Sequence, residues 1–305
     1  MNTKNSICAL NENKNSCLSP EIIKAISSIA IADESNTNII KVSDSLNCDT
    51  TLSKQEQELC VLKKIKNITE LDDLKKSIDK QILKNFKIPA GSLDKNYWLN
   101  NTEIDNVQFQ LQNQFDGYYY STIHMIDLEN FKPSNNSLIL NNDKLLNIKD
   151  IDFVKELSNN SKDKIFNFNN DLKYFGLVCN TDLSSNRGIH WFSIFIDFTK
   201  TPIQIEYFNS SGYSLTTGTH LNERKEFYKF FKNLADELTR NGFPAQFIQV
   251  TEIEHQATDT ANCGSYSLYY IYSRLKGIDP SYFKNTKITD AEVEKFRSVL
   301  WRVDK

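Results

Sequence analysis

Two apolar, aromatic segments of this chain each begin beside a residue with a reactive side chain. His190 comes directly before the run 191–198, whose composition is typical of a buried strand. Cys263 comes shortly before the run 266–271, which we interpret as part of a buried helix that begins at the cysteine. Because a strand and a helix hold their end residues rigidly, the pattern predicts an α+β domain that fixes a histidine and a cysteine in place.

Two more polar residues extend this pair toward a complete set of reactive groups. A free thiol has a pKa of about 8.5, so it needs an imidazole beside it to form a thiolate at neutral pH. Asn209 follows the predicted strand 203–208 and can accept the second imidazole N–H, which fixes the ring and its tautomer. Gln256 lies seven residues before Cys263 and can join the Cys263 backbone N–H in binding an oxyanion. With His190 as general base, these are the groups that a cysteine hydrolase requires.

Each of these residues also has an ordinary structural explanation. A cysteine at a helix start is most often a small buried hydrophobe, and a histidine beside a tryptophan in a strand is more often a core residue. The chain has three other histidines, at positions 124, 220 and 255. His255 is the main alternative base because it adjoins Gln256, but it lies on the same predicted loop as Cys263 and would need an unusual turn to reach it. The combination of His190 with Asn209, Gln256 and Cys263 therefore favours His190 as the general base.

The order His-Trp, Asn, Gln, Cys-Gly resembles the Ulp1/SENP and adenovirus-protease superfamily of cysteine proteases, called clan CE. A second motif, Tyr-Trp-Leu-Asn-Asn-Thr-Glu-Ile at 97–104, is similar to the segment that opens the catalytic domain of SUMO proteases. The resemblance implies a papain-related core with a central mixed sheet flanked by helices. It also implies that Trp98 and Trp191 form a narrow tunnel around a Gly-Gly-X cleavage site. Ordinary core packing of the two indoles is the alternative, and it is compatible with the tunnel.

Several departures from the cellular pattern indicate a viral branch of this superfamily. Asn209 stands where cellular SUMO proteases usually have Asp, and Asn262 rather than Asp precedes the cysteine. The Gln-to-Cys interval of seven resembles adenovirus protease. The His-to-Asn interval of nineteen resembles the polyprotein-processing proteases of African swine fever virus and giant DNA viruses. This resemblance implies a cysteine endopeptidase that cleaves viral structural polyproteins or capsid precursors after Gly-Gly-X sites during virion maturation.

Three other functions remain open at this point. A SUMO or ubiquitin-like deconjugating protease that acts on host proteins would share every catalytic residue. An acetyltransferase of the bacterial-effector type uses a similar order of histidine, acid and cysteine. A non-enzymatic scaffold could retain the fold with an idle site, although such a site has no reason to keep all four groups. The expected partner is a protein substrate, either a polyprotein or a diglycine-ended ubiquitin-like modifier, and no cofactor or metal is expected.

The chain of 305 residues is long enough for one catalytic domain and an appendage. We expect a helical N-terminal arm or domain over 1–88 and the clan CE catalytic domain over 89–305, because Lys-Ile-Pro-Ala-Gly at 87–91 interrupts the helical pattern. The arm's helices are expected at 20–32, at 54–66 and from 69 onward, with a polar loop at 33–52. Their apolar stripe is expected to dock on the catalytic domain or to bind substrate or a viral core component. In the catalytic domain we expect helices at 98–115, 222–240, from 263 and from 290, strands at 118–126, 175–180, 191–198, 203–208 and 245–251, and loops over 130–170.

Charge and cysteine content limit the remaining possibilities. The net charge of −3 without a basic cluster gives no indication of nucleic-acid binding, although the adenovirus relative implies that a DNA or peptide activator is conceivable. No apolar run approaches the roughly 20 residues of a membrane span, and the N-terminus is too polar for a signal peptide. We therefore expect a soluble, intracellular protein, and the resemblance implies that it is located in the virion and the host cytoplasm (viral factory) if the chain is viral, and in the cytoplasm otherwise. The six cysteines show neither metal-type pairs nor dense disulfide spacing, so reduced thiols are expected.

Overall fold

The computed structural model describes residues 6–10, 15–31, 38–89, 96–121, 123–127, 137–140, 144–147, 172–215, 220–240, 242–250 and 252–302. Its contacts divide the chain into two compact units, of which unit 1 comprises Met1–Ala90 with Ser298–Lys305 and unit 2 comprises Gly91–Arg297. The last residues group with unit 1 because β10 (Trp301–Arg302) pairs in parallel with β1 (Ile88–Pro89), which no sequence pattern indicated. The catalytic role of 89–305 and the role of 1–88 as an arm stay predictions.

The described part of unit 1 is helical. Its helices are α1 (Pro20–Ile31), α2 (Ile39–Ser45), α3 (Lys54–Ile68) and α4 (Asp72–Asn85). Helix α3 begins where it was predicted, with a capping box in which the Ser53 hydroxyl accepts from the Glu56 N–H and the Glu56 carboxylate accepts from the Ser53 N–H. The prediction of a loop over 33–52 is wrong at α2, where the Asn38 side chain caps a short helix. Its polar composition concealed two buried residues, Ile39 and Val42, that join the core of unit 1.

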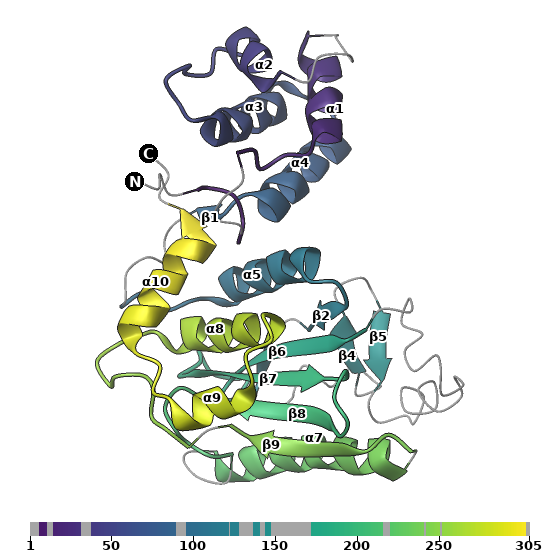
Figure 1. Ribbon diagram of the computed structural model, residues 1–305, viewed down its shortest axis with the longest axis vertical. Coiled ribbons are helices and arrows are strands. Elements are labelled where there is room, and N and C mark those ends of the chain that lie inside the picture. The colour runs from purple at the N-terminus through teal and green to yellow at the C-terminus, as the bar shows by residue number, and fades with distance from the viewer. Residues whose placement is uncertain are drawn as a thin grey trace. The chain divides into compact units, whose positions relative to one another are not determined.

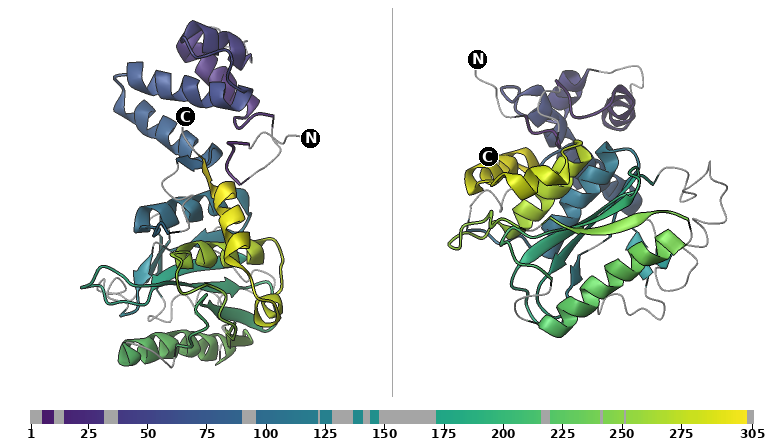
Figure 2. Two further views of the ribbon diagram at one scale, coloured as in Figure 1. Left: turned by 90° about the vertical axis from the view of Figure 1, so that its left-hand side faces the viewer. Right: turned by 60° about the horizontal axis from the view of Figure 1, so that its bottom comes forward.

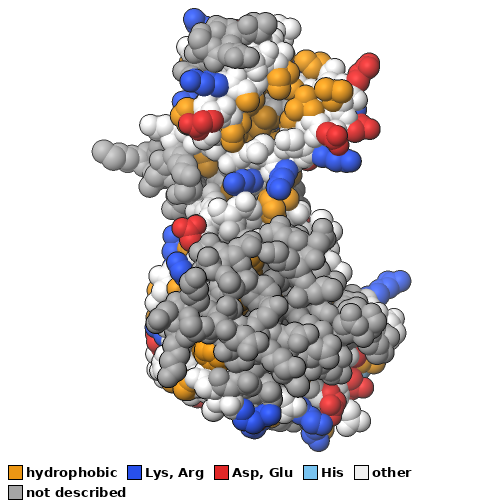
Figure 3. All heavy atoms as spheres, turned by 90° about the vertical axis from the view of Figure 1, so that its right-hand side faces the viewer, with side chains coloured by type: hydrophobic (Ala, Val, Ile, Leu, Met, Phe, Trp, Pro, Cys, Tyr) orange, Lys and Arg blue, Asp and Glu red, His pale blue; other side chains and the backbone are white. Residues whose placement is uncertain are grey.

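The apolar stripe predicted on α4 packs within unit 1. Ile78 is buried in the core of this unit, and Leu74 and Ile82 pack against that core. Leu71, by contrast, is 67% exposed. Figure 3 shows further hydrophobic side chains at the surface of unit 1. The expectation that the whole stripe docks on the catalytic domain is therefore wrong for the residues that fill the core of unit 1.

The expectation of reduced thiols is wrong for four of the six cysteines. Disulfides join Cys8 to Cys17 and Cys48 to Cys60, all in unit 1. Cys179 and Cys263, in unit 2, are free and buried. A small helical unit has little apolar surface to bury. Disulfides stabilise such a unit because they lower the conformational entropy of its unfolded chain. The paired cysteines are only 9 and 12 residues apart, but six cysteines allow many pairings, so the sequence did not indicate this one.

Unit 2 is built on a mixed sheet, which confirms the predicted fold class. Its strands are β2 (Tyr118–Tyr120), β3 (His124–Met125), β6 (Tyr174–Asn180), β7 (Trp191–Asp197), β8 (Ile203–Phe208) and β9 (Ala245–Gln249). They lie in the order β2-β6-β7-β8-β9, with β3 also paired to β6. The pairs β6–β7 and β7–β8 are antiparallel, and β2–β6, β3–β6 and β8–β9 are parallel. Every residue of β7 is buried, so both faces of the sheet are covered.

Helices cover both faces of this sheet (Figures 1 and 2). On one face lie α5 (Asn101–Gln114) and α8 (Cys263–Leu275), and on the other lies the long α7 (Leu221–Arg240). The apolar side of α7, with Phe227, Phe231, Leu234 and Leu238, packs on the sheet around Phe192. The chain continues into α9 (Pro280–Asn285) and α10 (Asp290–Leu300). The core therefore holds β7, β8 and α8 in a fixed arrangement.

The segment predicted as loops is only partly described. Within it, β4 (Ser137–Leu140) and β5 (Lys144–Asn147) form an antiparallel hairpin, so the prediction of loops is wrong there. The remainder of 130–170 lies outside the described residues. The predicted strand 118–126 consists of two short strands, β2 and β3, that pair with successive parts of β6.

Candidate active site

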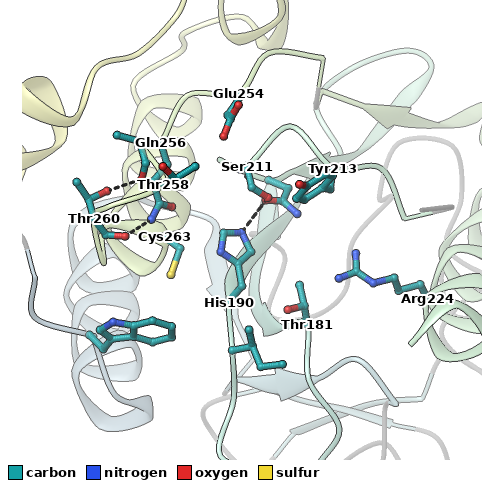
Figure 4. Close-up of a pocket in the computed structure, with 14 residues that line it drawn as sticks. Thr181, His190, Ser211, Tyr213, Arg224, Glu254, Gln256, Thr258, Thr260 and Cys263 are labelled. Atoms are coloured by element: carbon teal, nitrogen blue, oxygen red, sulfur yellow. Dashed lines mark hydrogen bonds between the residues drawn. The ribbon is translucent and has the colours of Figure 1, made fainter. Parts of the chain in front are cut away.

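One cavity of about 470 Å³ in unit 2 brings the predicted catalytic residues together (Figure 4). A volume of this size can hold a short peptide segment. The residues that line it come from strand ends, the start of α8, α7 and the segment before α8. They are Trp98, Thr181, Ile189, His190, Asn209, Ser211, Tyr213, Arg224, Glu254, Gln256, Ala257, Thr258, Thr260 and Cys263.

His190 lies directly before β7 and is held from one side of its ring. Its Nε2 atom is 2.7 Å from Asn209 Oδ1 and 3.4 Å from the Ser211 hydroxyl. Burial lowers the pKa of the His190 imidazole, the bond to Asn209 opposes that shift, and the positive charge of Arg224 adds to it. The ring is therefore neutral at pH 7 in the free protein.

Asn209 lies directly after β8 and is buried. Its Oδ1 atom accepts from the Ser211 backbone N–H at 3.0 Å and from the Ser211 hydroxyl at 2.7 Å, in addition to the imidazole. Its Nδ2 atom donates to the Tyr207 hydroxyl at 3.0 Å. The carboxamide is thus held at both ends, with its oxygen toward His190.

Cys263 is the first residue of α8, and only 2% of it is exposed. In Figure 4 its sulfur points toward the His190 ring. Burial raises the pKa of the thiol, and hydrogen bonds from the backbone of Trp191 and Gly264 lower it in part. A first-turn N–H has no partner within its own helix, so the Cys263 N–H can serve an anion bound beside the sulfur.

Gln256 lies in the segment before α8, and its carboxamide is oriented by two bonds. Its Nε2 atom donates to the Thr260 carbonyl at 2.7 Å, and its Oε1 atom accepts from the Ser210 hydroxyl at 2.9 Å. A carboxamide nitrogen carries two hydrogens, so the bond to Thr260 occupies one of them. The other can be directed at an oxyanion in the cavity that Gln256 and Cys263 both line.

Asp290, at the start of α10, fixes the segment that carries Gln256. One carboxylate oxygen accepts from the Thr260 hydroxyl at 2.9 Å and from Asn262 Nδ2 at 2.7 Å, and the other accepts from the Ala257 N–H at 2.9 Å. The sequence predicts this residue only as the start of a helix. Its role in the site follows from tertiary packing, and no spacing in the sequence signals it.

Asn262 replaces the aspartate expected in cellular relatives, and its surroundings suit an amide. Its Nδ2 atom donates to Asp290, and its Oδ1 atom accepts from the Arg297 guanidinium at 3.1 Å. A carboxylate at 262 would accept from Arg297 but would face the Asp290 carboxylate without a donor. An amide therefore fits between the acid and the base that α10 supplies.

The two tryptophans predicted to bind substrate occupy different positions. Trp98 is 53% exposed and lines the cavity. Trp191 is 5% exposed and is not among the lining residues. Its indole N–H donates to the Leu99 carbonyl at 3.0 Å, next to Trp98. A side chain at Gly264 would come within about 3.2 Å of Leu99 and Trp191, so the start of α8 packs tightly here. The tunnel role of Trp191 stays a prediction, and its observed contact positions the segment that carries Trp98.

His255, the alternative base, does not line the cavity. It is buried, and its Nδ1 atom accepts from the Ile288 backbone N–H at 3.0 Å. Burial lowers the pKa of His255 to about 4, so the ring stays neutral. His220 lies 3.2 Å from the Asp182 carboxylate, and it does not line the cavity either. His190 is therefore the histidine that the fold brings to Cys263.

Several residues of the cavity carried no signal in the sequence. Thr181 and Ile189 flank the base, while Arg224 from α7 and Glu254 place one positive and one negative charge in the lining of the cavity. Within the described residues, no group of three or more histidine, cysteine or acidic side chains is arranged to hold a metal ion. No helix in the described ranges combines the length and hydrophobicity of a membrane span.

Comparison with known proteins agrees with this geometry. The chain is 28% identical over 293 residues to a protein named SUMO-1 cysteine protease S273R from African swine fever virus (isolate Pig/Kenya/KEN-50/1950), covering 95% of this chain and 93% of that protein. It is 27% identical, with the same coverage, to Cysteine protease S273R of isolate Tick/Malawi/Lil 20-1/1983. The crystal structure of the African swine fever virus pS273R protease superposes with a TM-score of 0.63 at 26% identity, covering 98% of this chain and 96% of that chain.

No family model matches the chain. The relatives nevertheless match it along nearly its whole length in both sequence and fold. The chain is therefore a cysteine-type endopeptidase that is homologous to the S273R proteases of African swine fever virus and shares their fold.

Proposed function

We propose that this protease processes viral structural polyproteins or capsid precursors after Gly-Gly-X sites during virion maturation, in the virion and the host cytoplasm. In this proposal Cys263 is the nucleophile, His190 the general base and later the general acid, and Asn209 the group that orients His190. Gln256 and the Cys263 N–H bind the oxyanion. The main observation in support is that the side chains of all four residues line one cavity.

The first half of the reaction transfers the acyl group to sulfur. His190 Nδ1 accepts the thiol proton as the sulfur attacks the scissile carbonyl, and the electron pair of the C=O bond moves to oxygen. The Cys263 N–H and one Gln256 N–H stabilise that oxyanion. When the intermediate collapses, the C–N bond breaks and the leaving amine takes the proton from His190. A thioester on Cys263 and the C-terminal product result.

The second half of the reaction returns the enzyme to its starting state. A water molecule gives a proton to His190 and attacks the thioester carbonyl, and the same two N–H groups stabilise the second oxyanion. Collapse expels the thiolate, which recovers its proton from His190. The Cys263 thiol and the His190 ring are both neutral again at the end of the cycle.

The resting state in this proposal is a neutral thiol beside a neutral imidazole. Burial raises the pKa of Cys263 and lowers that of His190, so both shifts oppose an ion pair before substrate binds. Asn209 accepts a hydrogen bond from the ring but adds no negative charge to stabilise an imidazolium. Proton transfer is therefore coupled to attack, when the N-terminus of α8 and the oxyanion donors act together on the developing charge.

The buried sulfur supports a glycine on the acyl side of the cut. Only 2% of Cys263 is exposed, so a scissile carbonyl must come close to the cavity wall to reach the sulfur. A substrate residue with a large side chain fits less easily in such a place than one with a small side chain. Glycine carries no such side chain, and the exposed indole of Trp98 at the cavity can pack on a flat diglycine backbone.

A direct test is cleavage of candidate capsid precursors by the purified chain, with the products identified by mass spectrometry. New C-termini ending in Gly-Gly are expected, and Cys263→Ala should produce none. Cleavage at unrelated sequences would contradict the substrate proposal while leaving the protease activity intact.

A second function is supported by the name of a relative, since one homologue is called a SUMO-1 cysteine protease. A deconjugase would recognise the folded surface of a ubiquitin-like modifier in addition to its diglycine end. A SUMO or ubiquitin vinyl sulfone should then label Cys263 much faster than a short Gly-Gly vinyl sulfone peptide does. Equal labelling rates would favour the polyprotein protease.

A further inference from the structure

Asn209 is the middle of a series of hydrogen bonds that begins at a backbone carbonyl. Its Oδ1 atom lies 2.7 Å from His190 Nε2, and its Nδ2 atom donates to the Tyr207 hydroxyl at 3.0 Å. The Tyr207 hydroxyl in turn donates to the Tyr213 backbone carbonyl at 2.9 Å. All three distances are normal for hydrogen bonds, so the series connects the imidazole to the main chain without a gap.

The carbonyl at the start of the series fixes the direction of every bond. A carbonyl oxygen only accepts, so the Tyr207 hydroxyl uses its single hydrogen on Tyr213 and offers only lone pairs to Asn209. The group that faces those lone pairs must be the Nδ2 amide, and Oδ1 then faces His190. Burial raises the pKa of Tyr207 above its ordinary value, which keeps the hydroxyl protonated.

This direction matters because an asparagine has one donor and one acceptor, whereas an aspartate has two acceptors. If the carboxamide were rotated by half a turn, Nδ2 would donate to His190 Nε2, and the neutral ring would carry its proton on Nδ1. Nδ1 is the nitrogen left for Cys263, and in that tautomer it could not accept the thiol proton. An asparagine in this position therefore needs a neighbour that selects its orientation.

We propose that Tyr207 is a positioning residue that sets the amide orientation of Asn209 and thereby the tautomer of His190. This inference rests on the proposed roles of His190 and Cys263. Tyr207 touches neither substrate nor sulfur in this scheme, and it acts only through Asn209.

Ser211 holds the same carboxamide from its other end. Its backbone N–H and its hydroxyl both donate to Asn209 Oδ1, at 3.0 Å and 2.7 Å. Both donors favour the orientation that Tyr207 selects. Loss of the Tyr207 hydroxyl therefore weakens the preference without reversing it, and a partial loss of turnover is expected.

The test combines ring-nitrogen NMR with kinetics on the full chain. With ¹⁵N-labelled histidine, the four histidines give few resonances, and His190→Gln assigns those of His190. The unsubstituted chain should show the proton on Nε2. Tyr207→Phe should increase the Nδ1–H population and lower kcat about fivefold to tenfold with KM unchanged, as expected for one lost buried hydrogen bond.

Two comparisons separate positioning from general loss of stability. Tyr270→Phe is the matched control, because Tyr270 is also a buried tyrosine, and its hydroxyl donates to Glu206 at 2.6 Å, away from the cavity. It should lower the melting temperature and leave both the tautomer and kcat unchanged. In an Asn209→Asp background, where either oxygen can accept, Tyr207→Phe should change kcat less than about twofold.

A His190 ring with its proton on Nδ1 in the unsubstituted chain would overturn the proposal, whether or not any variant folds. It would also be overturned if Tyr207→Phe kept the original tautomer and kcat, or if it were equally harmful in the Asn209→Asp background. The NMR measurement needs no turnover. A chain that cleaves no Gly-Gly substrate but shows the expected tautomer shift would therefore contradict the proposed function and support the role of Tyr207.

Discussion

The two sides of the active site are held in place by different means. On the base side, His190 and Asn209 stand at the ends of β7 and β8, which pair antiparallel within the sheet. On the oxyanion side, Gln256 lies in an irregular segment whose neighbours are tied to one carboxylate, that of Asp290. Backbone ladders support the first side, and side-chain hydrogen bonds support the second.

This difference predicts how each side responds to substitution. A strand end keeps its position when one side chain is changed, because many main-chain hydrogen bonds hold it. A loop that depends on one carboxylate loses several bonds at once when that group is removed. The oxyanion side should therefore be the more sensitive to changes away from the reacting atoms.

The largest effect should come from removing either reacting group. Cys263→Ala or His190→Ala should lower kcat/KM for a Gly-Gly-X substrate by about 10³-fold or more, because the two act as a unit. Both variants should keep the circular dichroism of the parent. Cys179→Ala is the matched control, since Cys179 is the other free and buried cysteine and does not line the cavity. Loss of cleavage in that control as well would mean that the assay reports folding.

The residues at the element ends and Gln256 could be predicted from the sequence, but the contacts that hold the segment around Gln256 could not. His190 and Cys263 begin apolar runs with clear strand and helix character, and Asn209 ends another such run, so local patterns place all three at element ends. Asp290 comes from a helix whose packing against the loop is decided by the tertiary fold. Trp191 shows a further contact of this kind, because its indole donates to the Leu99 carbonyl, which its motif did not indicate, while its predicted substrate contact stays a prediction.

In unit 1 as well, the sequence predicts some structural features and misses others. Capping chemistry at Ser53 is local, and it predicts the start of α3 correctly. The disulfides Cys8–Cys17 and Cys48–Cys60 close short loops of the chain, but the sequence does not say which of the many possible pairings of six cysteines forms. The short helix around Ile39 and Val42 is stabilised by burial, which its polar composition hides.

The second-largest effect should come from Asp290. Asp290→Ala removes the acceptor of three bonds and frees the segment that carries Gln256, so kcat should fall about tenfold to hundredfold with little change in KM. Glu292→Ala is the control for the helix itself, because Glu292 caps the start of α10 through Thr289. That variant should lower stability by about 1 kcal/mol and leave kcat near the parent value. Equal kcat losses in the two variants would show that the helix start, and not the loop contacts, controls the site.

On the base side, Asn209→Asp should change the activity less than these variants do, and it should not lower the activity at every pH. Burial places the pKa of His190 below its ordinary value of about 6.5, and the acid limb of kcat/KM follows the loss of the neutral ring. A carboxylate at 209 favours the imidazolium, so it raises that pKa and moves the acid limb to higher pH by about one unit. Activity near pH 6 should fall, whereas activity near pH 8 should be kept or increased. A limb that stays in place would mean that it reports another group.

The smallest effects should come from two adjacent serines that serve opposite sides. The Ser210 hydroxyl donates to Gln256 Oε1 at 2.9 Å, and the Ser211 hydroxyl donates to Asn209 Oδ1 at 2.7 Å. Ser210→Ala should lower kcat about twofold to fivefold without moving the acid limb, because it loosens only the oxyanion donor. Ser211→Ala leaves Asn209 Oδ1 more available to the imidazole, so the acid limb should move to higher pH by a few tenths of a unit. The Ser211 N–H and the Tyr207 hydroxyl still select the orientation of Asn209, so kcat should change less than about twofold. The two substitutions are chemically identical and adjacent in the chain. The pH–rate profile of Ser210→Ala therefore reports on the oxyanion side, and that of Ser211→Ala reports on the base side. Indistinguishable profiles would show that the two sides are coupled through the 209–211 turn and would remove the basis for treating them separately.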